Sequence, residues 1–453
     1  MRRRWTFLLI ALVAVLGLFA AACTASESDD DGGSESADAD TDGEPTASDT
    51  GITEDTVKIA VIWADFTNLV DLGFAVDLGD TEEQIQALVD DVNASGGVNG
   101  RMIEVTFHAQ DPLDATSIER TCLEATQDEE AFAVIATNGV GTLTNACVAV
   151  DNETLYLSTQ GALISDLEAA EDRIFVFNFT TPQLAELMVE HLDGEGELEG
   201  KTIGIVTGDD VIGLEVNDTL GPALEEAGYE VAASQTLACN DTGAICEGYP
   251  VAVSAMADAG VDAVFSSLGA LAYPAFAAEG AAQGFTPQYY TFASGGTSDV
   301  VAKEMAAAEL EGSYEGALGV VVAPGNNNLA NRGDEPEPEP NVGCNDILEE
   351  QAGYRLDYRD DGNGAHTNNC VVFQVLMAAL EAAGANPTTE SVSEAIQTET
   401  GDFLLNGGAA ASFAEGKFVA PNQFVATRWT TDCENTQGYE GCWVVISDFI
   451  DAG

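Results

Sequence analysis

The chain has 453 residues, with 78 Asp and Glu against only 14 Lys and Arg, so its formal net charge is −64. Hydrophobic residues make up 45% of the chain, which is ordinary for a globular protein and excludes a chain that is disordered throughout. The charge argues against nucleic acid and anionic lipid as partners, since both are bound by clustered Lys and Arg.

The first segment is typical of a secretory signal. Arginines at residues 2–4 precede an apolar run over residues 5–22, which ends in three alanines directly before Cys23. A membrane-spanning helix is the alternative for a run of this length, but small residues before a cysteine resemble a bacterial lipoprotein signal. That resemblance implies that residues 1–22 are removed and that Cys23 carries the lipid that anchors the protein. Residues 23–55 are rich in Ser, Asp, Glu and Gly and predict a flexible tether.

Two alternating series of strands and helices follow. Short β-branched runs predict strands, and apolar residues at helical spacing predict helices. In the first series we expect strands at residues 56–62, 103–107, 133–136, 155–157 and 174–179, and helices at 82–93, 115–127 and before 150. In the second we expect strands at residues 201–206, 230–234, 263–266 and 288–292, and helices at 214–227, 251–259 and 271–283. This order predicts an α/β protein with two mainly parallel sheets flanked by helices.

The last part of the chain departs from this order. Prolines alternate with acidic residues inside residues 325–343, which predicts an extended polar loop. Residues 371–383 have helical spacing, and strand-like pieces follow from Phe403 onward.

The cysteines support export. Of the nine cysteines, eight follow Cys23, an even number that is expected outside the reducing cytosol. Their spacing suggests four disulfides, Cys122–Cys147, Cys239–Cys246, Cys344–Cys370 and Cys433–Cys442. Metal ligation is the alternative. No CxxC pair occurs, however, and the histidines at positions 108, 191 and 366 are scattered, so we expect no metal and no cofactor.

Five stretches carry a family resemblance. They are VKIAVIWADFTN from Val57, DDVNASGGVNGRMIEV from Asp90, DPLDATSIER from Asp111, GKTIGIVTGDD from Gly200 and LEEAGYEV from Leu224. Together they resemble the substrate-binding proteins of branched-chain amino acid ABC transporters, the type I periplasmic binding proteins. The likeness covers nearly all of residues 56–425 in the family's order, and NASGGVNGR is its most specific piece.

The resemblance implies a fold of two lobes joined by three crossings. We place the crossings near Thr180, Ala317 and Phe413. The first lobe is then formed by residues 56–180 and 317–412, and the second lobe by residues 181–316 and 413–453.

In this family the ligand lies between the lobes, off the carboxyl ends of the strands. The first-lobe residues expected to contact it are Trp63, Phe66, Asn138, Gly139, Val140, Thr142, Ser158, Thr159 and Gln160. The glycines of the loop at residues 138–142 let backbone amides approach a ligand carboxylate, although an ordinary turn is the alternative. The hydroxyl groups at residues 158–160 could bind a ligand or cap a helix. The aromatic side chains at positions 63 and 66 could stack on a ligand or merely cover the strand end.

The second-lobe residues expected at the ligand are Asp210, Ile212, Ser267, Leu268 and Ser294. Alignment with the amino-acid binders places the acid that pairs with a ligand ammonium near Ser294. The aromatic residue that covers the ligand falls near residues 211–212, and the two hydroxyl positions that hold its carboxylate fall near Val140 and Leu163. The set of residues that would bind both the carboxylate and the ammonium group of a zwitterion is therefore incomplete. The carboxylates of Asp65, Asp209 or Asp210 could supply a charge, and the ligand need not be an α-amino acid.

The resemblance implies an extracytoplasmic lipoprotein of an ABC importer, in the periplasm or on the outer face of the cytoplasmic membrane. It would capture a small polar solute, such as an amino acid or a related amide or carboxylate, by hinge closure and pass it to a membrane permease. A ligand-sensing receptor of the same fold, without a role in transport, is the alternative. We do not expect an enzyme, because the sequence has no GxSxG motif and no P-loop.

The charge generates a prediction about salt. An excess of like charge repels itself when the chain is compact, and salt screens that repulsion. If the charge is an adaptation to salty surroundings, the melting temperature of residues 24–453 should rise between dilute buffer and molar salt. A melting temperature that stays flat across this range would favour the other explanation, an acidic surface that serves only solubility.

Overall fold

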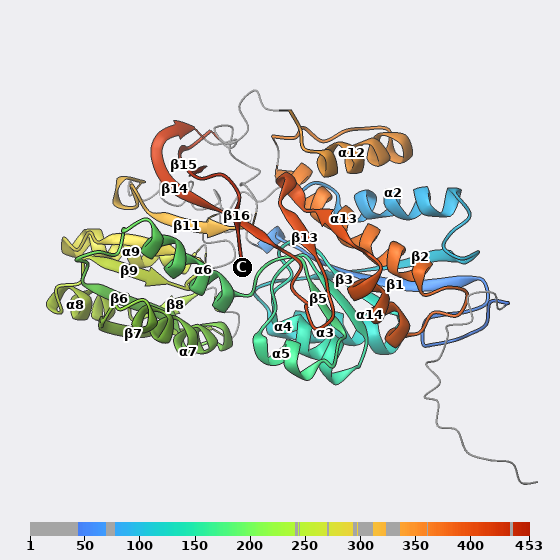
Figure 1. The fold of residues 1–453 in the computed structure, drawn as a ribbon, viewed down its shortest axis with the longest axis horizontal. Coiled ribbons are helices and arrows are strands. Elements are labelled where there is room, and N and C mark those ends of the chain that lie inside the picture. Colours follow the sequence, from blue (N-terminus) through green and yellow to red (C-terminus); the bar gives the residue numbers. More distant parts are fainter. Residues whose placement is uncertain are drawn as a thin grey trace, which may run out of the picture. The chain divides into compact units, whose positions relative to one another are not determined.

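Two β-sheets flanked by helices organise the chain (Figure 1). The computed structural model describes residues 44–68, 78–240, 243, 245–269, 271–292, 297, 311–322, 336–359, 361–434 and 438–453. The predicted signal, the predicted lipidation site Cys23, the part of the predicted tether before residue 44, and Ser294 lie outside these residues. None of the described helices is both long enough and apolar enough to cross a membrane.

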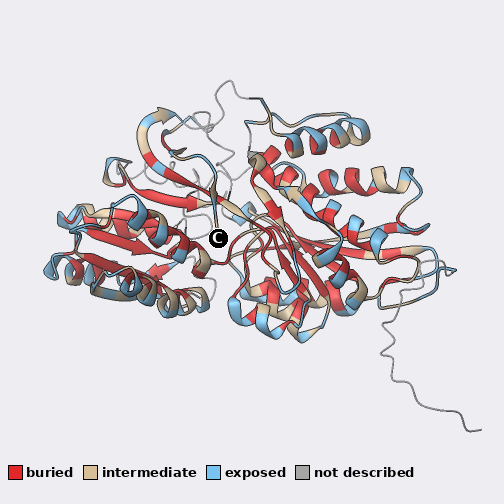
Figure 2. Ribbon diagram, viewed as in Figure 1, coloured by how far each residue is buried: buried red, intermediate tan, exposed pale blue. Residues whose placement is uncertain are grey.

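The first sheet has five parallel strands in the order β2-β1-β3-β4-β5. They are β1 (Thr56–Ala64), β2 (Met102–Gln110), β3 (Ala133–Ala136), β4 (Leu155–Ser158) and β5 (Ile174–Val176). Every residue of β3, β4 and β5 is buried, because helices cover both faces of the sheet (Figure 2). This double burial explains why these strands are short continuous apolar runs rather than alternating ones.

Helices from two separate parts of the chain cover this sheet. They are α2 (Thr81–Ala94), α3 (Ala115–Leu123) with η1 (Glu124–Asp128), α4 (Leu143–Asn145) with η2 (Ala146–Asp151), α5 (Ile164–Ala169), α12 (Glu339–Ala352), α13 (Asp361–Ala382) and α14 (Thr389–Thr398). Figure 1 shows α3, α4 and α5 on one face and α2 and α13 on the other, while α12 packs beside α2 and α13, and α14 packs against α13.

The second sheet is larger and mixed, with the order β15-β14-β11-β10-β9-β6-β7-β8 and β16 paired to β14. Its strands are β6 (Ile203–Gly208), β7 (Val231–Cys239), β8 (Cys246–Glu247), β9 (Ala263–Ser266), β10 (Gln288–Thr291), β11 (Leu318–Val321), β14 (Gln423–Glu434), β15 (Glu440–Val445) and β16 (Ile450–Asp451). Its helices are α6 (Thr181–Gly194), α7 (Val211–Glu226), α8 (Tyr249–Asp258) and α9 (Ala272–Gln283), of which α6 packs on α7 and α8 on α9. The remaining elements are η3 (Glu311–Ser313), η4 (Asn406–Gly408) and the ribbon of β12 (Asp402–Leu404) and β13 (Ala410–Ser412).

The structure changes several sequence expectations. Residues 44–55, expected to belong to the flexible tether, are held against the first lobe, since Ile52 is buried and Arg101 donates to the Thr46 and Thr53 carbonyls. Helix α12 begins at Glu339, inside the stretch expected to be extended, because a proline is tolerated in the first turn of a helix. Helix α13 begins at Asp361 rather than at residue 371, since its first turns carry buried polar residues in place of apolar ones. Strand β11 pairs with β10 and β14 of the second sheet, so a crossing at Ala317 is too early.

Four disulfides join neighbouring elements, and they are the pairs that the spacing suggested. Cys122–Cys147 links α3 to η2, Cys239–Cys246 links β7 to β8, Cys344–Cys370 links α12 to α13, and Cys433–Cys442 links β14 to β15. Each bridge closes a segment of the chain and restricts its unfolded state.

A buried asparagine holds three elements of the first lobe together. The Asn341 amide nitrogen on α12 donates to Asn363 Oδ1 on α13 at 2.9 Å and to Asn406 Oδ1 on η4 at 2.8 Å. Asn341 Oδ1 accepts from the Gly407 backbone N–H at 3.2 Å. Because Asn341 is fully buried, water cannot replace these bonds without local opening.

We expect Asn341→Leu to reduce the free energy of unfolding by about 2 to 4 kcal/mol, since it leaves several buried polar groups unsatisfied. The measurement is urea unfolding at high salt. Val342→Ala is the control, because the neighbouring Val342 is 36% exposed. Equal losses for the two variants would show that the asparagine bonds contribute little.

Candidate ligand-binding site

The strands of the first sheet end together at one edge. Ile62 of β1 lies opposite Ala136 of β3, which in turn lies opposite Ser158 of β4. The loops that follow these strands therefore gather at the carboxyl edge, where parallel α/β sheets bind their ligands. The predicted first-lobe residues lie on or directly after these three strands.

The loop after β3 is closely covered by an aromatic ring. Gly139 has a φ of +87°, and a Cβ atom at this position would lie 2.2 Å from Phe66 Cζ. A side chain there would therefore displace the half-buried Phe66 ring, so glycine is required. The neighbouring Asn138 Oδ1 is buried and has no hydrogen-bond partner within the described part of the chain. Val140 is fully buried, and its N–H donates to the Thr137 carbonyl at 3.1 Å, while Thr142 is half-buried before α4.

The end of β4 contributes two hydroxyl groups with different surroundings. Ser158 Oγ accepts from the Gln160 backbone N–H at 3.1 Å, so this hydroxyl shapes the turn. The Thr159 hydroxyl is buried and makes no hydrogen bond to any described residue, although its backbone N–H donates to the Ala136 carbonyl at 3.1 Å. Buried polar groups nearly always have a partner, so the Thr159 hydroxyl marks a place for a water or a ligand group.

The loop after β1 is held by its own hydrogen bonds. Trp63 is half-buried, and its indole N–H donates to Glu82 Oε1 on α2 at 3.0 Å. Asp65 Oδ1 accepts from the Thr67 N–H at 3.0 Å and from the Thr67 hydroxyl at 2.6 Å. The Asp65 carboxylate therefore stabilises the local turn, and the Trp63 ring is fixed beside the first turn of α2.

A buried polar group near this edge was missed from the sequence. Gln110 ends β2, is fully buried, and its Oε1 accepts from Thr121 at 3.0 Å and from Thr144 at 3.1 Å. Asn145, which follows Thr144 in the chain, is also buried. Neither polar atom of its side chain has a hydrogen-bond partner among the described residues. The available signal was a strand that ends in glutamine together with a Thr-Asn pair on α4, the helix that follows β3. It was hidden because these residues are far apart along the chain.

The second lobe presents its own strand ends. Asp210 after β6 caps α7, and its Oδ1 accepts from the Ile212 N–H at 3.1 Å and the Gly213 N–H at 3.2 Å. Asp209 Oδ1 accepts from the Cys239 N–H at 2.7 Å, which ties this loop to the disulfide-bonded end of β7. The two acids considered as ligand charges here thus have structural tasks, and Ile212 is half-buried.

The ends of β9 and β10 add hydroxyl groups. Ser266 Oγ accepts from the Leu268 N–H at 3.0 Å, and both Ser267 and Leu268 are buried. The hydroxyl of Thr291, the last residue of β10, is buried without a partner in the described residues. This repeats, in the second lobe, the unsatisfied hydroxyl found at Thr159.

The three histidines do not gather at these strand ends. His366 is buried, with Nε2 3.0 Å from the Cys344 carbonyl oxygen, and burial lowers its pKa. His108 Nδ1 lies 3.6 Å from Glu124, and His191 packs edge-on against Phe424. Among the described residues, no group of three or more His, Cys, Asp or Glu side chains is arranged to hold a metal ion.

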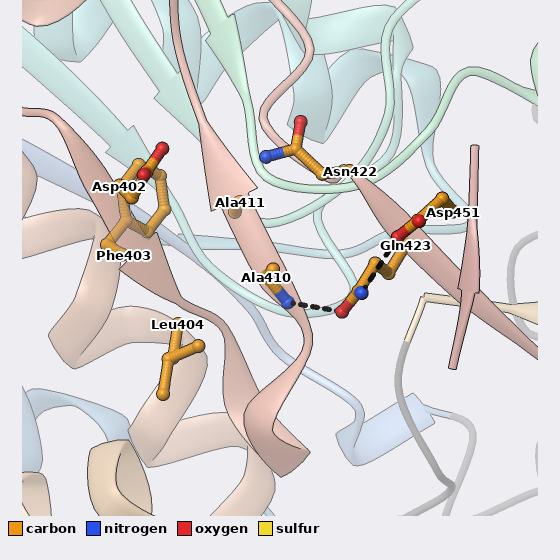
Figure 3. Close-up of a pocket in the computed structure, with 8 residues that line it drawn as sticks. All are labelled: Asp402, Phe403, Leu404, Ala410, Ala411, Asn422, Gln423 and Asp451. Atoms are coloured by element: carbon orange, nitrogen blue, oxygen red, sulfur yellow. Dashed lines mark hydrogen bonds between the residues drawn. The ribbon is translucent and has the colours of Figure 1, made fainter. Parts of the chain in front are cut away.

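A separate pocket of about 360 Å³ lies beside the β12–β13 ribbon (Figure 3). It is lined by Asp402, Phe403, Leu404, Ala410, Ala411, Asn422, Gln423 and Asp451. Gln423 bridges it, accepting from the Ala410 N–H at 3.2 Å and donating to Asp451 Oδ1 at 3.0 Å. None of the residues predicted at the ligand belongs to this pocket.

Solved structures with this fold bind chemically diverse solutes. The leucine-, isoleucine-, valine-, threonine- and alanine-binding protein of Brucella ovis is 15% identical, with a TM-score of 0.62 over 88% of this chain and 96% of that chain. An ABC transporter solute-binding protein of Rhodopseudomonas palustris in complex with 4-hydroxybenzoate is 16% identical, with a TM-score of 0.62 over 87% and 98%. A fatty acid ABC transporter substrate-binding protein of Thermomonospora curvata is 17% identical, with a TM-score of 0.59 over 89% and 94%. At such identities the likeness shows the fold alone.

Comparison with curated protein sequences finds no match. The model of a protein family described as periplasmic binding protein matches residues 56–434, which include almost every element of both sheets. The two-lobed α/β architecture agrees with that match, and so does the gathering of loops at the carboxyl ends of the strands. The chain therefore belongs to the periplasmic binding proteins and has their type I fold.

Proposed function

We propose that this protein is the extracytoplasmic solute-binding lipoprotein of an ABC importer. It captures a small polar solute between its lobes and delivers it to a membrane permease. The observation that carries the proposal is the group of polar loops at the carboxyl edge of the first sheet, in a chain of the periplasmic binding protein family. The buried oxygens of Asn138 and Thr159, which have no hydrogen-bond partner in the part of the chain that the structure describes, belong to those loops.

The proposed ligand belongs to the class of amino acids and related amides and carboxylates, and within that class we favour the members that are not zwitterions. An oxygen such as Asn138 Oδ1 needs an N–H or O–H donor, which amides, ammonium groups and hydroxyl groups provide. The carboxylates of Asp65, Asp209 and Asp210 each accept hydrogen bonds from their own surroundings, which favours a ligand other than a zwitterion. Similar structures include binders of branched-chain amino acids, of 4-hydroxybenzoate and of fatty acids, so the fold accommodates several chemistries.

Anchoring through Cys23 is part of the proposal, since an importer's binding protein must stay near its permease. The basic start, the apolar run and the alanines before Cys23 support it. A ligand-sensing receptor of the same fold is the second candidate. Uptake of the labelled ligand by cells that lack this protein separates the two candidates. Uptake should be lost if the protein is a subunit of the importer, and it should be unchanged if the protein is only a sensor.

We expect a solute screen to identify the ligand. Residues 24–453 at high salt are tested by thermal shift with amino acids, amides, urea, short carboxylates, polyamines and aromatic acids such as 4-hydroxybenzoate. A ligand at one hundred times its Kd stabilises the native state by about 2.7 kcal/mol and so raises the melting temperature. A shift with leucine alone would contradict the non-zwitterionic ligand. No shift with any class would contradict solute binding.

Thr159→Val separates binding from folding. Because the Thr159 hydroxyl has no hydrogen-bond partner among the described residues, its loss should leave the melting temperature of the free protein unchanged or slightly higher. The Kd of the solute found in the screen should rise about five- to tenfold, measured by calorimetry. Thr154→Val, just before β4 and so at its other end, is the matched control and should leave the Kd unchanged. A Kd that Thr159→Val does not change would remove this hydroxyl from the site.

A further inference from the structure

Helix α5 starts without a cap of its own. Its N-cap residue is Leu163, whose side chain makes no capping hydrogen bond. The first N–H groups of any helix lack partners inside the helix, and leucine is among the poorest residues for this position. The start of α5 therefore needs an acceptor from elsewhere in the molecule.

That acceptor is Glu215, which lies on α7 of the second lobe. Glu215 Oε2 accepts from the Ile164 N–H at 3.0 Å. Glu215 Oε1 accepts from the Ser165 N–H at 3.1 Å and from the Ser165 hydroxyl at 2.9 Å. One carboxylate thus receives three hydrogen bonds from the first lobe, and hydrogen bonds to a charged acceptor are stronger than neutral ones.

This contact joins the two segments on which the proposed ligand contacts lie. Helix α5 follows the loop of Ser158 and Thr159, and α7 starts directly after Asp210. A bond between the first turn of α5 and the second turn of α7 can form only when these two segments approach each other. The contact is therefore sensitive to the separation of the two lobes.

We propose that Glu215 is a positioning residue that favours the closed arrangement of the lobes by capping α5 across the interface between them. The inference rests on the proposed hinge-closing function, in which ligand affinity depends on the balance between open and closed states. By shifting that balance, Glu215 acts on the ligand without touching it.

A neighbouring acid lies close enough to Glu215 for the two charges to interact. Asp166, the third residue of α5, is buried. Burial, and then the charges of Glu215 and Asp151, raise the pKa of its carboxyl to about 6. A charged Asp166 repels Glu215 and so opposes the contact.

The test measures the distance between the lobes in the ligand-free protein. Spin labels are placed on cysteines introduced at the exposed positions Glu119 of α3 and Asp258 of α8, and electron–electron resonance gives the distance distribution. We expect Glu215→Ala to raise the ratio of long to short distances about tenfold, as expected for the loss of a few exposed, charge-assisted hydrogen bonds. Ser165→Ala should have a smaller effect, because both backbone donors remain.

Glu225→Ala is the matched control, since Glu225 is an exposed glutamate on the same helix and its loss changes the charge equally. Hydrogen exchange at the Ile164 and Ser165 amides provides a second measurement. Faster exchange in Glu215→Ala together with longer distances supports the proposal. Faster exchange with an unchanged distance distribution would show a merely local cap and overturn it, as would distances identical to those of Glu225→Ala. No ligand is used, so a failed solute screen would not affect this test.

Discussion

The parallel register of the first sheet is the constraint on which the candidate site depends. Because β1, β3 and β4 run in the same direction and end level with one another, their loops must meet at one edge. The polar side chains at that edge then have only a few backbone N–H and C=O groups within hydrogen-bonding distance. Ser158 finds one in its own turn, whereas Thr159 and Asn138 do not find one in the described chain. These unsatisfied groups follow from the way the strand ends gather, and the proposed ligand would supply their partners.

The most family-specific stretch, NASGGVNGR, has a structural task. The Asn93 side chain donates to the Ile103 carbonyl at 3.0 Å and accepts from the Ile103 N–H at 2.8 Å, which fixes α2 to β2. The Asn99 amide donates to the carbonyls of Leu380 and Gly384, both at 2.9 Å, and so closes the end of α13. The buried Arg101 donates to three backbone carbonyls, of Thr46, Thr53 and Ala385. Family membership could be recognised from this stretch because the fold depends on it, even though it lies away from the proposed ligand.

The acidic composition has a structural counterpart in how the rare cations are used. Arg101 donates to three neutral backbone carbonyls, whereas Arg355 lies among Glu337, Asp346 and Glu349. Like-charged acids also meet at the lobe contact, where Glu215 and Asp166 oppose each other. Cations are rare in this protein, so few carboxylates can be paired with one. Glu215 instead accepts hydrogen bonds from backbone N–H groups at the start of α5, and this joins the two lobes without a cation.

The sequence by itself determined the local elements, the alternation that predicts the parallel first sheet and the parallel part of the mixed second sheet, the family, and cysteine pairs that are close in the chain. These properties follow from short-range periodicity and spacing, which tertiary contacts rarely reverse. Only the tertiary structure decided that β11 joins the second sheet, that Gln110 meets Thr144, and that Glu215 caps α5. The physical reason is common to all three. Each depends on which surfaces meet after the chain has folded, and a strand edge, a buried amide or a carboxylate carries no local signal of its distant partner.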